Sequence, residues 1–275
     1  MNRRAVAAIG TALLAAGVAA YPQASAAAPK PIRMSGQQIT QVLVADLAYF
    51  YRHERPRTPR FDLSIGGTDA GLADTVRGIS DAALVSRDLE PGDPRGLVLT
   101  RLARSGVCLV SHRSNPVPSI NRALLQDIVA GRVTNWSQVH GSPRTDPIVP
   151  IALDPGVGAA HVFEQVFIDD DTPFAWRPIT LLLGLQVRDL VERTPAAFAY
   201  LDFAQARSVH AIPYQGVPCT RTAIRDGSYP ATRPIGIVTV GRPKGALRRF
   251  LRWARTSRTA RRVIATRYVP IARVR

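Results

Sequence analysis

The chain has 275 residues, enough for one large lobe or two medium lobes with their own hydrophobic cores. Its formal net charge is +16, carried almost entirely by arginine, because Lys30 and Lys244 are the only lysines. This excess marks a polyanion, an acidic ligand or a membrane surface as partner, or it reflects a bias in composition. No continuous apolar run near twenty residues follows the N-terminal segment, so we expect no membrane span in the mature protein.

Residues 1–28 have the pattern of an export signal. Arg3 and Arg4 precede an alanine-rich apolar stretch, and Ala24-Ser25-Ala26 forms a small-residue cleavage site. We therefore expect a periplasmic or secreted protein, cleaved near Ala26. No cysteine follows the apolar stretch, which argues against a lipid anchor, and the residues do not decide between Sec and twin-arginine export.

The helix and strand patterns of the first ninety residues alternate. Ser35 to His53 predicts a helix with Ser35 or Gly36 as cap, and Leu72 to Gly78 predicts a second helix with Thr68 or Asp69 as cap. We expect the apolar face of the first helix to hold Ile39, Val42, Leu43, Leu47 and Phe50. A short strand is predicted for Phe61 to Gly67 and a buried strand for Asp81 to Ser86. In open α/β sheets ligands bind beyond the carboxyl ends of the strands, so the polar loops there are the expected binding edge.

The middle of the chain predicts a second lobe. We expect two strands, Leu97 to Ala103 and Gly106 to His112, the second crossing between lobes, and helices over Ile120 to Val129 and Leu185 to Arg193. Pro195 to Tyr200 and Val209 to Pro213 are predicted to return the chain to the first lobe.

A strand, glycine loop and helix are predicted for Ile148 to Phe163, IVPIALDPGVGAAHVF. In an α/β protein such a junction points the first free N–H groups of a helix into a crevice, where the helix dipole adds partial positive charge. An anion would therefore sit there, although the loop carries no Ser, Thr, Lys or Arg.

The C-terminal segment predicts a strand over Ile235 to Val240 and one helix over Ala246 to Ala265. We expect its arginines to form a solvated face rather than a nucleic-acid or lipid site, because export and the lack of interleaved aromatics argue against nucleic acid. The outward arginines are Arg248, Arg249, Arg252, Arg255, Arg258, Arg261 and Arg262.

The two cysteines lie far apart in the sequence. Cys108 lies in the apolar segment GVCLVS, and Cys219 follows VHAIPYQGVP. In an oxidising compartment a disulfide between them would close a loop of about 110 residues. In the chain-entropy model this would raise the free energy of unfolding by roughly 4 to 5 kcal/mol. Two separate buried thiols are the alternative. No His or Cys lies beside either one, so we expect no zinc site and no cofactor.

Other motifs argue against catalysis and nucleotide binding. Gly156-x-Gly158-x-x-His161 lacks the third glycine of a dinucleotide loop, and no Gly-x-Ser-x-Gly nucleophile elbow occurs. The five histidines form no i, i+4 pair. Trp136 and Tyr229 are expected to pack in the core rather than stack on a ligand. We predict no enzyme activity.

Several motifs in a fixed order resemble the phosphate-binding periplasmic receptors of ABC-type uptake systems. They are GGTDAGLADTVRGISDAALVSRDLEP, IVAGRVTNWSQVHG, PGVGAAHVF and DGSYPATRP, followed by a terminal helix ending near YVPI. The resemblance covers nearly all of the mature chain. It implies an α/β, two-lobed type II periplasmic-binding-protein fold, with hinge strands near 106–112 and 208–214. The implied organisation is a signal peptide (1–28), a first lobe (29–110 and 209–275) and a second lobe (111–208).

The resemblance also implies ligand-binding positions. In the first lobe they are Gln38 and the backbone of Ile39, then Thr68, Ser86 and Arg87. In the second lobe they are Gly156, Val157, Gly158 and Ala159. The family's arginine and hydroxyls are missing at Leu153, Val157, Ala159 and Ala160, which removes one charge-assisted partner and two hydroxyl bonds.

Three interpretations follow from these departures. The cleft binds phosphate or a related small anion, with Arg87, His112 or His161 replacing the lost charge. Alternatively, it takes a less charged ligand against an apolar wall of Val157 and Ala159, or the protein is a scaffold that binds a protein partner or a polyanion. We expect the first: a monomeric receptor that closes on its ligand and presents it to an ABC-type membrane permease, with no nucleic-acid partner.

Overall fold

Within the described part of the chain, one ten-stranded sheet runs through both lobes in the order β2-β1-β3-β9-β4-β7-β5-β6, with β8 and β10 also paired to β4. The computed structural model describes residues 29–155 and 157–271. The export signal predicted for 1–28 and the site residue Gly156 lie outside the described residues. The strands are β1 (Ile32–Gly36), β2 (Phe61–Ile65), β3 (Ala82–Val85), β4 (Leu97–Ser111), β5 (Val149–Leu153), β6 (Ile179–Leu181), β7 (Ala197–Asp202), β8 (His210–Ile212), β9 (Thr232–Val240) and β10 (Val269–Pro270).

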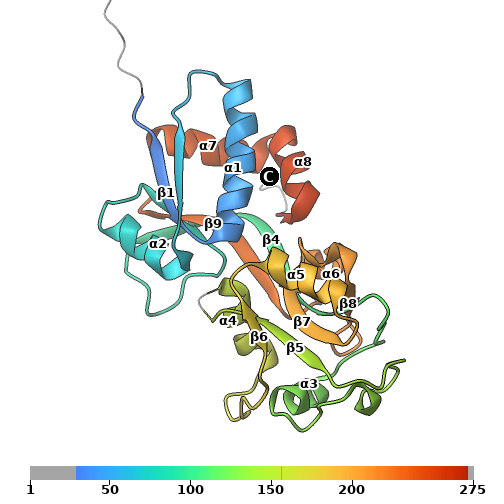
Figure 1. Ribbon diagram of the computed structural model, residues 1–275. Helices are drawn as coiled ribbons and strands as arrows, with labels where there is room; N and C mark the ends of the chain where they lie inside the picture. Colours follow the sequence, from blue (N-terminus) through green and yellow to red (C-terminus); the bar gives the residue numbers. More distant parts are fainter. Residues whose placement is uncertain (1–28, 156, 272–275) are drawn as a thin grey trace, which may run out of the picture.

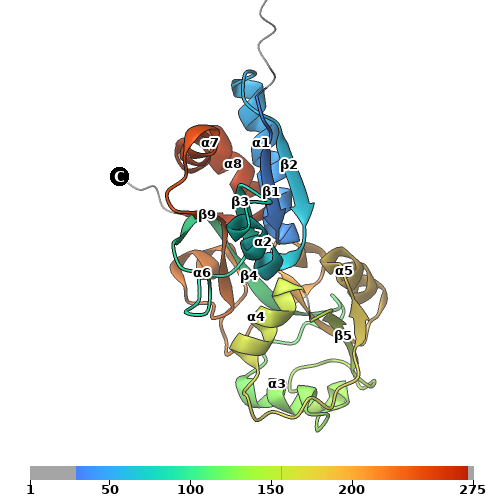
Figure 2. The same cartoon turned by 90° about the vertical axis from the view of Figure 1, so that its left-hand side faces the viewer.

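The long strand β4 connects two lobes. Its first part, up to Gly106, pairs antiparallel with β9, and its last part, from Val107, pairs antiparallel with β7. In the first lobe β1 pairs parallel with β2 and β3, and in the second lobe β5 pairs parallel with β6 and β7. Figures 1 and 2 show one lobe above the other, joined where β4 and β9 cross between them.

Helices cover the sheet in both lobes. None of those within the described residues is long and apolar enough to cross a membrane. The helices are α1 (Gln38–Glu54), α2 (Gly67–Val76), α3 (Arg122–Val129), α4 (Gly158–Phe167), α5 (Gly184–Arg193), α6 (Arg221–Asp226), α7 (Gly245–Thr256) and α8 (Arg258–Arg267), with 3-10 turns at Trp136–Gln138 and Ala206–Ser208.

The core of the first lobe lies between its sheet and the helices α1, α7 and α8. Leu43, Leu47 and Tyr51 of α1 are buried there, spaced four residues apart on one helical face. Val42 and Phe50, which we expected on this face, are 36% and 40% exposed. The prediction was wrong for these two because the buried stripe lies one residue to the side of the expected one.

The core of the second lobe surrounds β4, β5 and β7. Trp136 and Tyr229 are both fully buried in it, as expected. Trp136 Nε1 donates to the Ala196 carbonyl at 2.8 Å, and Tyr229 Oη donates to the Val107 carbonyl at 3.0 Å. Both polar groups are therefore satisfied, which makes these aromatics structural.

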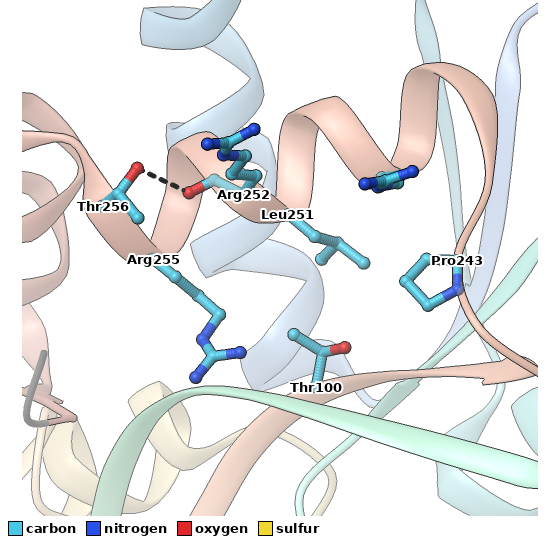
Figure 3. Close-up of a pocket in the computed structure, with 7 residues that line it drawn as sticks. Thr100, Pro243, Leu251, Arg252, Arg255 and Thr256 are labelled. Atoms are coloured by element: carbon cyan, nitrogen blue, oxygen red, sulfur yellow. Dashed lines mark hydrogen bonds between the residues drawn. The ribbon is translucent and has the colours of Figure 1, made fainter. Parts of the chain in front are cut away.

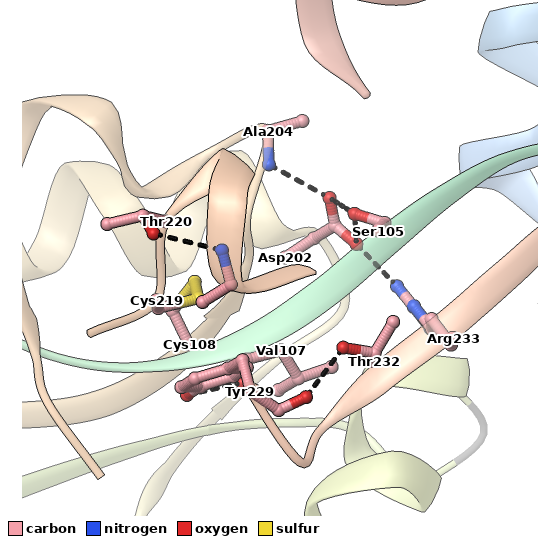
Figure 4. The surroundings of a disulfide bond; sticks show 11 residues. Ser105, Val107, Cys108, Asp202, Ala204, Cys219, Thr220, Tyr229, Thr232 and Arg233 are labelled. Atoms are coloured by element: carbon pink, nitrogen blue, oxygen red, sulfur yellow. Dashed lines mark hydrogen bonds and ion pairs between the residues drawn. A yellow bond between two sulfur atoms is a disulfide. The ribbon is translucent and has the colours of Figure 1, made fainter. Parts of the chain in front are cut away.

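Cys108 and Cys219 form a disulfide within the same core, which is the first of the two alternatives given by the sequence. The bridge joins β4 to the segment before α6 across 111 residues, and Figure 4 shows it beside the point where the two lobes meet. Ile212, Tyr214 and Ala231 also pack in this core. The predicted lobe boundaries stay a prediction, and this packing leads us to propose that the second lobe continues to about residue 231.

Several of the expected element boundaries differ from the observed ones. Residues 97–111 form one strand, because β9 pairs along it with only a register shift between Arg101 and Ala103. The C-terminal helix is two helices, because Ser257 is extended and its side chain accepts from the first N–H groups of α8. Ser35 and Gly36 lie in β1 rather than capping α1, and α2 begins at Gly67, so Thr68 and Asp69 lie inside its first turn.

Candidate functional site

The turn between β1 and α1 brings a glutamine into the cleft between the lobes. Gly36 has φ +139°, and a Cβ there would overlap the carbonyl oxygen of Leu84, so only glycine fits this close approach to β3. The next backbone N–H, that of Gln37, donates to the same Leu84 carbonyl at 2.8 Å. Glycine therefore lets the chain turn tightly and present Gln37 to the cleft.

Three polar groups of the first lobe converge on the first residue of α4 in the second lobe. A Cβ built on Gly158 would overlap Gln37 Nε2 and lie 3.0 Å from Ser86 Oγ and 3.3 Å from Arg233 Nη1. These groups come from the β1–α1 turn, the end of β3 and β9. Glycine at position 158 therefore allows polar groups from three elements to approach the start of α4 closely.

The N-terminus of α4 faces these donors. No side chain caps this helix, and Val157 is its N-cap residue. The first N–H groups of an uncapped helix and its dipole favour a negative charge. Tyr200 fixes the strand before the loop, because its hydroxyl contacts both the N–H and the carbonyl of Leu153 at 3.2 and 3.3 Å, and burial raises the pKa of this tyrosine so that it stays neutral.

Arg233 carries the buried charge of the cleft. Its Nη2 lies 2.8 Å from Asp202 Oδ2, and both side chains are only 4% exposed. The Asp202 carboxylate also accepts from Ser105 Oγ at 2.9 Å and from the Ala204 N–H at 3.0 Å, as Figure 4 shows. Arg233 Nε, in contrast, is buried without a hydrogen-bond partner. A buried guanidinium N–H without an acceptor calls for one, and an anion in the cleft would supply it.

The cleft holds two chambers that share Gln37 and Val157 in their lining. The larger chamber has a volume of 580 Å³, and its lining includes Gln38, Ile39, Val42, Ile65, Leu182 and Arg233. The smaller chamber has a volume of 160 Å³, and its lining includes Thr68, Ser86, Arg87, Gly158 and His161. The predicted site residues therefore divide between the chambers, with Ala159 in the larger one and Val157 in both.

Arg87 is occupied by acidic neighbours. Its guanidinium lies 2.7 Å from Asp69, 2.8 Å from Asp93 and 3.6 Å from Glu90. The hydrogen bond from Arg87 holds the pKa of Asp93 below its ordinary value, and the same bond raises the pKa of Arg87. Because three carboxylates surround its charge, Arg87 is poorly suited to replace the missing arginine. We expected that role for it, and Arg233 is better placed.

The two histidines considered as replacement charge differ in position. His112 is bonded through Nδ1 to Ser114 Oγ and through Nε2 to the Glu192 carbonyl, and it lines neither chamber. His161 lines the smaller chamber from the first turns of α4.

Gln37 and Arg233 are the residues that sequence reasoning missed. Gln37 is adjacent to the predicted Gln38, and helix periodicity could not tell which glutamine precedes the first turn. Arg233 lies in the motif DGSYPATRP, which we used for the resemblance and not for the site. The position of Arg233 in the apolar strand TRPIGIVTV could have indicated a site, because a buried charge requires a partner or a ligand.

A separate basic pocket lies on the outer side of the first lobe. It has a volume of 460 Å³ between α7 and β4, and Figure 3 shows Arg252 and Arg255 around Thr100 and Leu251. Arg248 completes its cationic lining, and none of the three arginines has an acidic partner among the described residues. This pocket is independent of the cleft.

Two α/β lobes that share one crossing sheet and enclose a cleft give the architecture of the two-lobed, type II periplasmic-binding-protein fold. The chain belongs to the PBP superfamily, because the family model described as "PBP superfamily domain" matches residues 21–258. The phosphate-binding protein PstS of Bacillus subtilis is 23% identical over 246 residues, which cover 87% of this chain and 80% of that relative.

Other similar proteins have related descriptions. Phosphate-binding protein PstS 2 of Streptococcus pneumoniae is 27% identical over 104 residues, and the match spans 38% of this chain and 35% of that relative's length. The crystal structure of a putative phosphate ABC transporter substrate-binding protein with bound phosphate, from Clostridium perfringens, aligns with a TM-score of 0.78 and 22% identity. That alignment covers 88% of this chain and 100% of the other, and it shows that the two share a fold.

Proposed function

We propose that this protein is an extracytoplasmic receptor that binds phosphate or a related small oxyanion between its lobes and delivers it to an ABC-type membrane permease. The observation that carries the proposal is the convergence of Gln37 Nε2, Ser86 Oγ and Arg233 Nη1 on the uncapped first residue of α4. The described relatives, phosphate-binding proteins of the same superfamily, support it. A monomer that closes without covalent chemistry suffices for this role.

The anion would be held mainly by hydrogen bonds. Each donor to a charged oxygen contributes about 1.5 to 3 kcal/mol, and a neutral hydrogen bond contributes about 1 kcal/mol. Arg233 adds directional N–H groups, but Asp202 already neutralises its charge. We therefore expect weaker binding than an unpaired arginine would provide.

The two halves of the site are in contact in this structure, because a Cβ on Gly158 would overlap Gln37 Nε2. Gln37, Ser86 and Arg233 belong to elements of the first lobe, whereas Gly158 begins a helix of the second lobe. An anion between them is bound fully only when α4 approaches the first lobe. Hinge motion in β4 and β9, which cross between the lobes, would therefore couple ligand binding to the shape seen by a permease.

Thermal unfolding with and without ligand tests the proposal. At 100 times its dissociation constant, phosphate or sulfate at fixed ionic strength should stabilise the protein by about 2.7 kcal/mol, which raises Tm by several degrees. Ser86→Ala should reduce this shift. The matched variant Ser64→Ala, at an exposed position of β2, should leave it unchanged. Absence of a shift with every oxyanion would refute the proposal.

A second candidate function rests on the basic pocket between α7 and β4. Three unpaired guanidinium groups around one 460 Å³ pocket suit a polyanion. No acidic residue follows Asp226 in the sequence, so no carboxylate in this C-terminal part offsets the charge.

Binding of long-chain polyphosphate tests this second function. Affinity should fall steeply with salt, because released counterions favour binding at low ionic strength. Replacement of the three pocket arginines by glutamine should abolish this binding, whereas an equal loss of charge elsewhere should not. The pocket variant is Arg248→Gln/Arg252→Gln/Arg255→Gln and the matched control is Arg57→Gln/Arg77→Gln/Arg95→Gln. Binding that is insensitive to salt, or equal loss in both variants, would refute it.

A further inference from the structure

The mouth of the larger chamber is lined by exposed apolar side chains from both lobes. Ile65 at the end of β2 is 63% exposed and Val42 of α1 is 36% exposed. From the second lobe, Leu182, Leu183 and Leu185 are 66%, 40% and 50% exposed. Single exposed apolar residues are ordinary, but five around one cavity form a surface that favours an apolar partner.

The inner end of the same chamber is polar. Arg233 lines it and is only 4% exposed, and its Nε has no hydrogen-bond partner. Gln37 lines it too and is 6% exposed. The contrast in exposure places the donors deep in the cleft and the leucines at its opening. The chamber is therefore amphipathic along its length.

The volume of the larger chamber is several times that of an inorganic oxyanion. A water molecule occupies about 30 Å³ in the liquid, and a tetrahedral oxyanion occupies only a few times that volume. The chamber has 580 Å³, which lies in the range of pockets for organic molecules, about 300 to 1,000 Å³. An anion at the Arg233 end would leave most of the chamber, including its leucines, without contact.

Two apolar side chains line the larger chamber at the start of α4. Val157 lines both chambers beside the first turn of α4, and Ala159 lines the larger one. Neither offers a hydrogen bond from its side chain. A ligand with four oxygens would therefore find no side-chain donor for an oxygen that faces these two residues, whereas a carbon substituent there would make apolar contact.

We propose that the ligand is a monosubstituted organophosphorus anion, a phosphonate or phosphate monoester with an apolar group. This inference rests on the proposed receptor function and names its substrate class. The PO₃ group binds at Gln37, Arg233 and the N-terminus of α4. The apolar group lies in the larger chamber against Leu182 and Leu185.

Isothermal titration with inorganic phosphate, phenylphosphonate and neutral benzyl alcohol tests the proposal. Phenylphosphonate should bind at least tenfold more tightly than phosphate, and benzyl alcohol should bind weakly because it lacks the anionic group. Leu182→Ser/Leu185→Ser should remove this advantage without changing the affinity for phosphate. The matched variant Val76→Ser/Ile79→Ser alters apolar residues of similar exposure that line neither chamber, and it should bind like the wild type.

The outcomes separate the two proposals. If phosphate binds and phenylphosphonate binds no more tightly, the organophosphorus proposal is refuted and the receptor function stands. If the advantage of phenylphosphonate survives in the leucine variant, the apolar mouth does not hold the substituent, and this proposal is again refuted. If neither anion binds, or benzyl alcohol binds as tightly as phenylphosphonate, the oxyanion receptor function itself fails.

Discussion

Alanine at position 158 should separate ligand binding from folding. The new Cβ would overlap Gln37 Nε2, which is the far end of a flexible side chain, so that amide can move away at small cost to the fold. The backbone at Gly158 is not left-handed, and alanine is a better helix former than glycine by about 0.5 to 1 kcal/mol. The free energy of unfolding without ligand should therefore stay the same or rise slightly.

The expected loss in binding follows from the displaced donor. Moving Gln37 out of the site removes one hydrogen bond to a charged oxygen, about 1.5 to 3 kcal/mol. Since 1.4 kcal/mol corresponds to a factor of ten, affinity for the anion should fall about 10- to 100-fold. Isothermal titration gives the affinity, and urea unfolding of the same preparation gives the stability.

A matched glycine provides the control. Gly92 is not left-handed, and a Cβ there would meet no atom within 4 Å, so Gly92→Ala should alter neither binding nor closure. The double variant Gln37→Ala/Gly158→Ala should bind no more weakly than Gln37→Ala alone, because the overlap is gone. Wild-type affinity in Gly158→Ala would refute the placement of the anion between Gln37 and α4.

Three further predictions concern stability, each measured by urea unfolding. Arg233→Met should lower the free energy of unfolding by about 3 to 5 kcal/mol, because it leaves the Asp202 carboxylate buried without its charged partner. The additional change Asp202→Leu should restore most of this loss, and no recovery in the double variant would contradict this account of the pair. Loss of the bridge in Cys108→Ala/Cys219→Ala should cost about 4 to 5 kcal/mol for a loop of this length, and a smaller effect would argue against the chain-entropy explanation. The pKa of Asp93 is lower in the folded state than in the unfolded state, so its ionised carboxylate stabilises the fold above the unfolded pKa near pH 4 and this stabilisation is lost as the pH falls further. The free energy of unfolding of Asp93→Asn should therefore depend less on pH below pH 4 than that of the wild type. Equal pH dependence in the two proteins would refute this role of Asp93.

Local sequence patterns predicted most of the elements because their signals are local. The apolar strand, glycine loop and helix over residues 148–163 occur as β5, the loop and α4, since periodicity and glycine position are properties of neighbouring residues. Local patterns failed where hydrogen bonding between strands that are distant in the sequence determines the extent of an element. The continuity of β4 depends on β9, which lies more than a hundred residues away in the sequence. Likewise, the point at which the chain returns to the first lobe depends on the strand that β8 pairs with, which is β4.

The candidate site shows the same limit. Arg87 and Arg233 each lie near a strand end, and the resemblance pointed to Arg87 as the arginine of the site. Asp93, only six residues from Arg87, occupies that guanidinium, whereas Asp202 reaches Arg233 only because β7 and β9 both flank β4. The acidic partner therefore decides which arginine is available, and it is visible only in three dimensions.

The positive charge of the chain and the chemistry of its cleft are separate properties. The three arginines of the basic pocket lie on α7, where they raise the net charge without lining either chamber. Within the cleft, Asp202 neutralises Arg233, and Nε of that arginine remains the buried group without a partner. A neutral pair with one unsatisfied donor selects a ligand by hydrogen-bond geometry more than by charge. Contacts made by the part of the ligand outside its anionic group should then determine affinity. The leucines at the mouth of the larger chamber would provide these contacts.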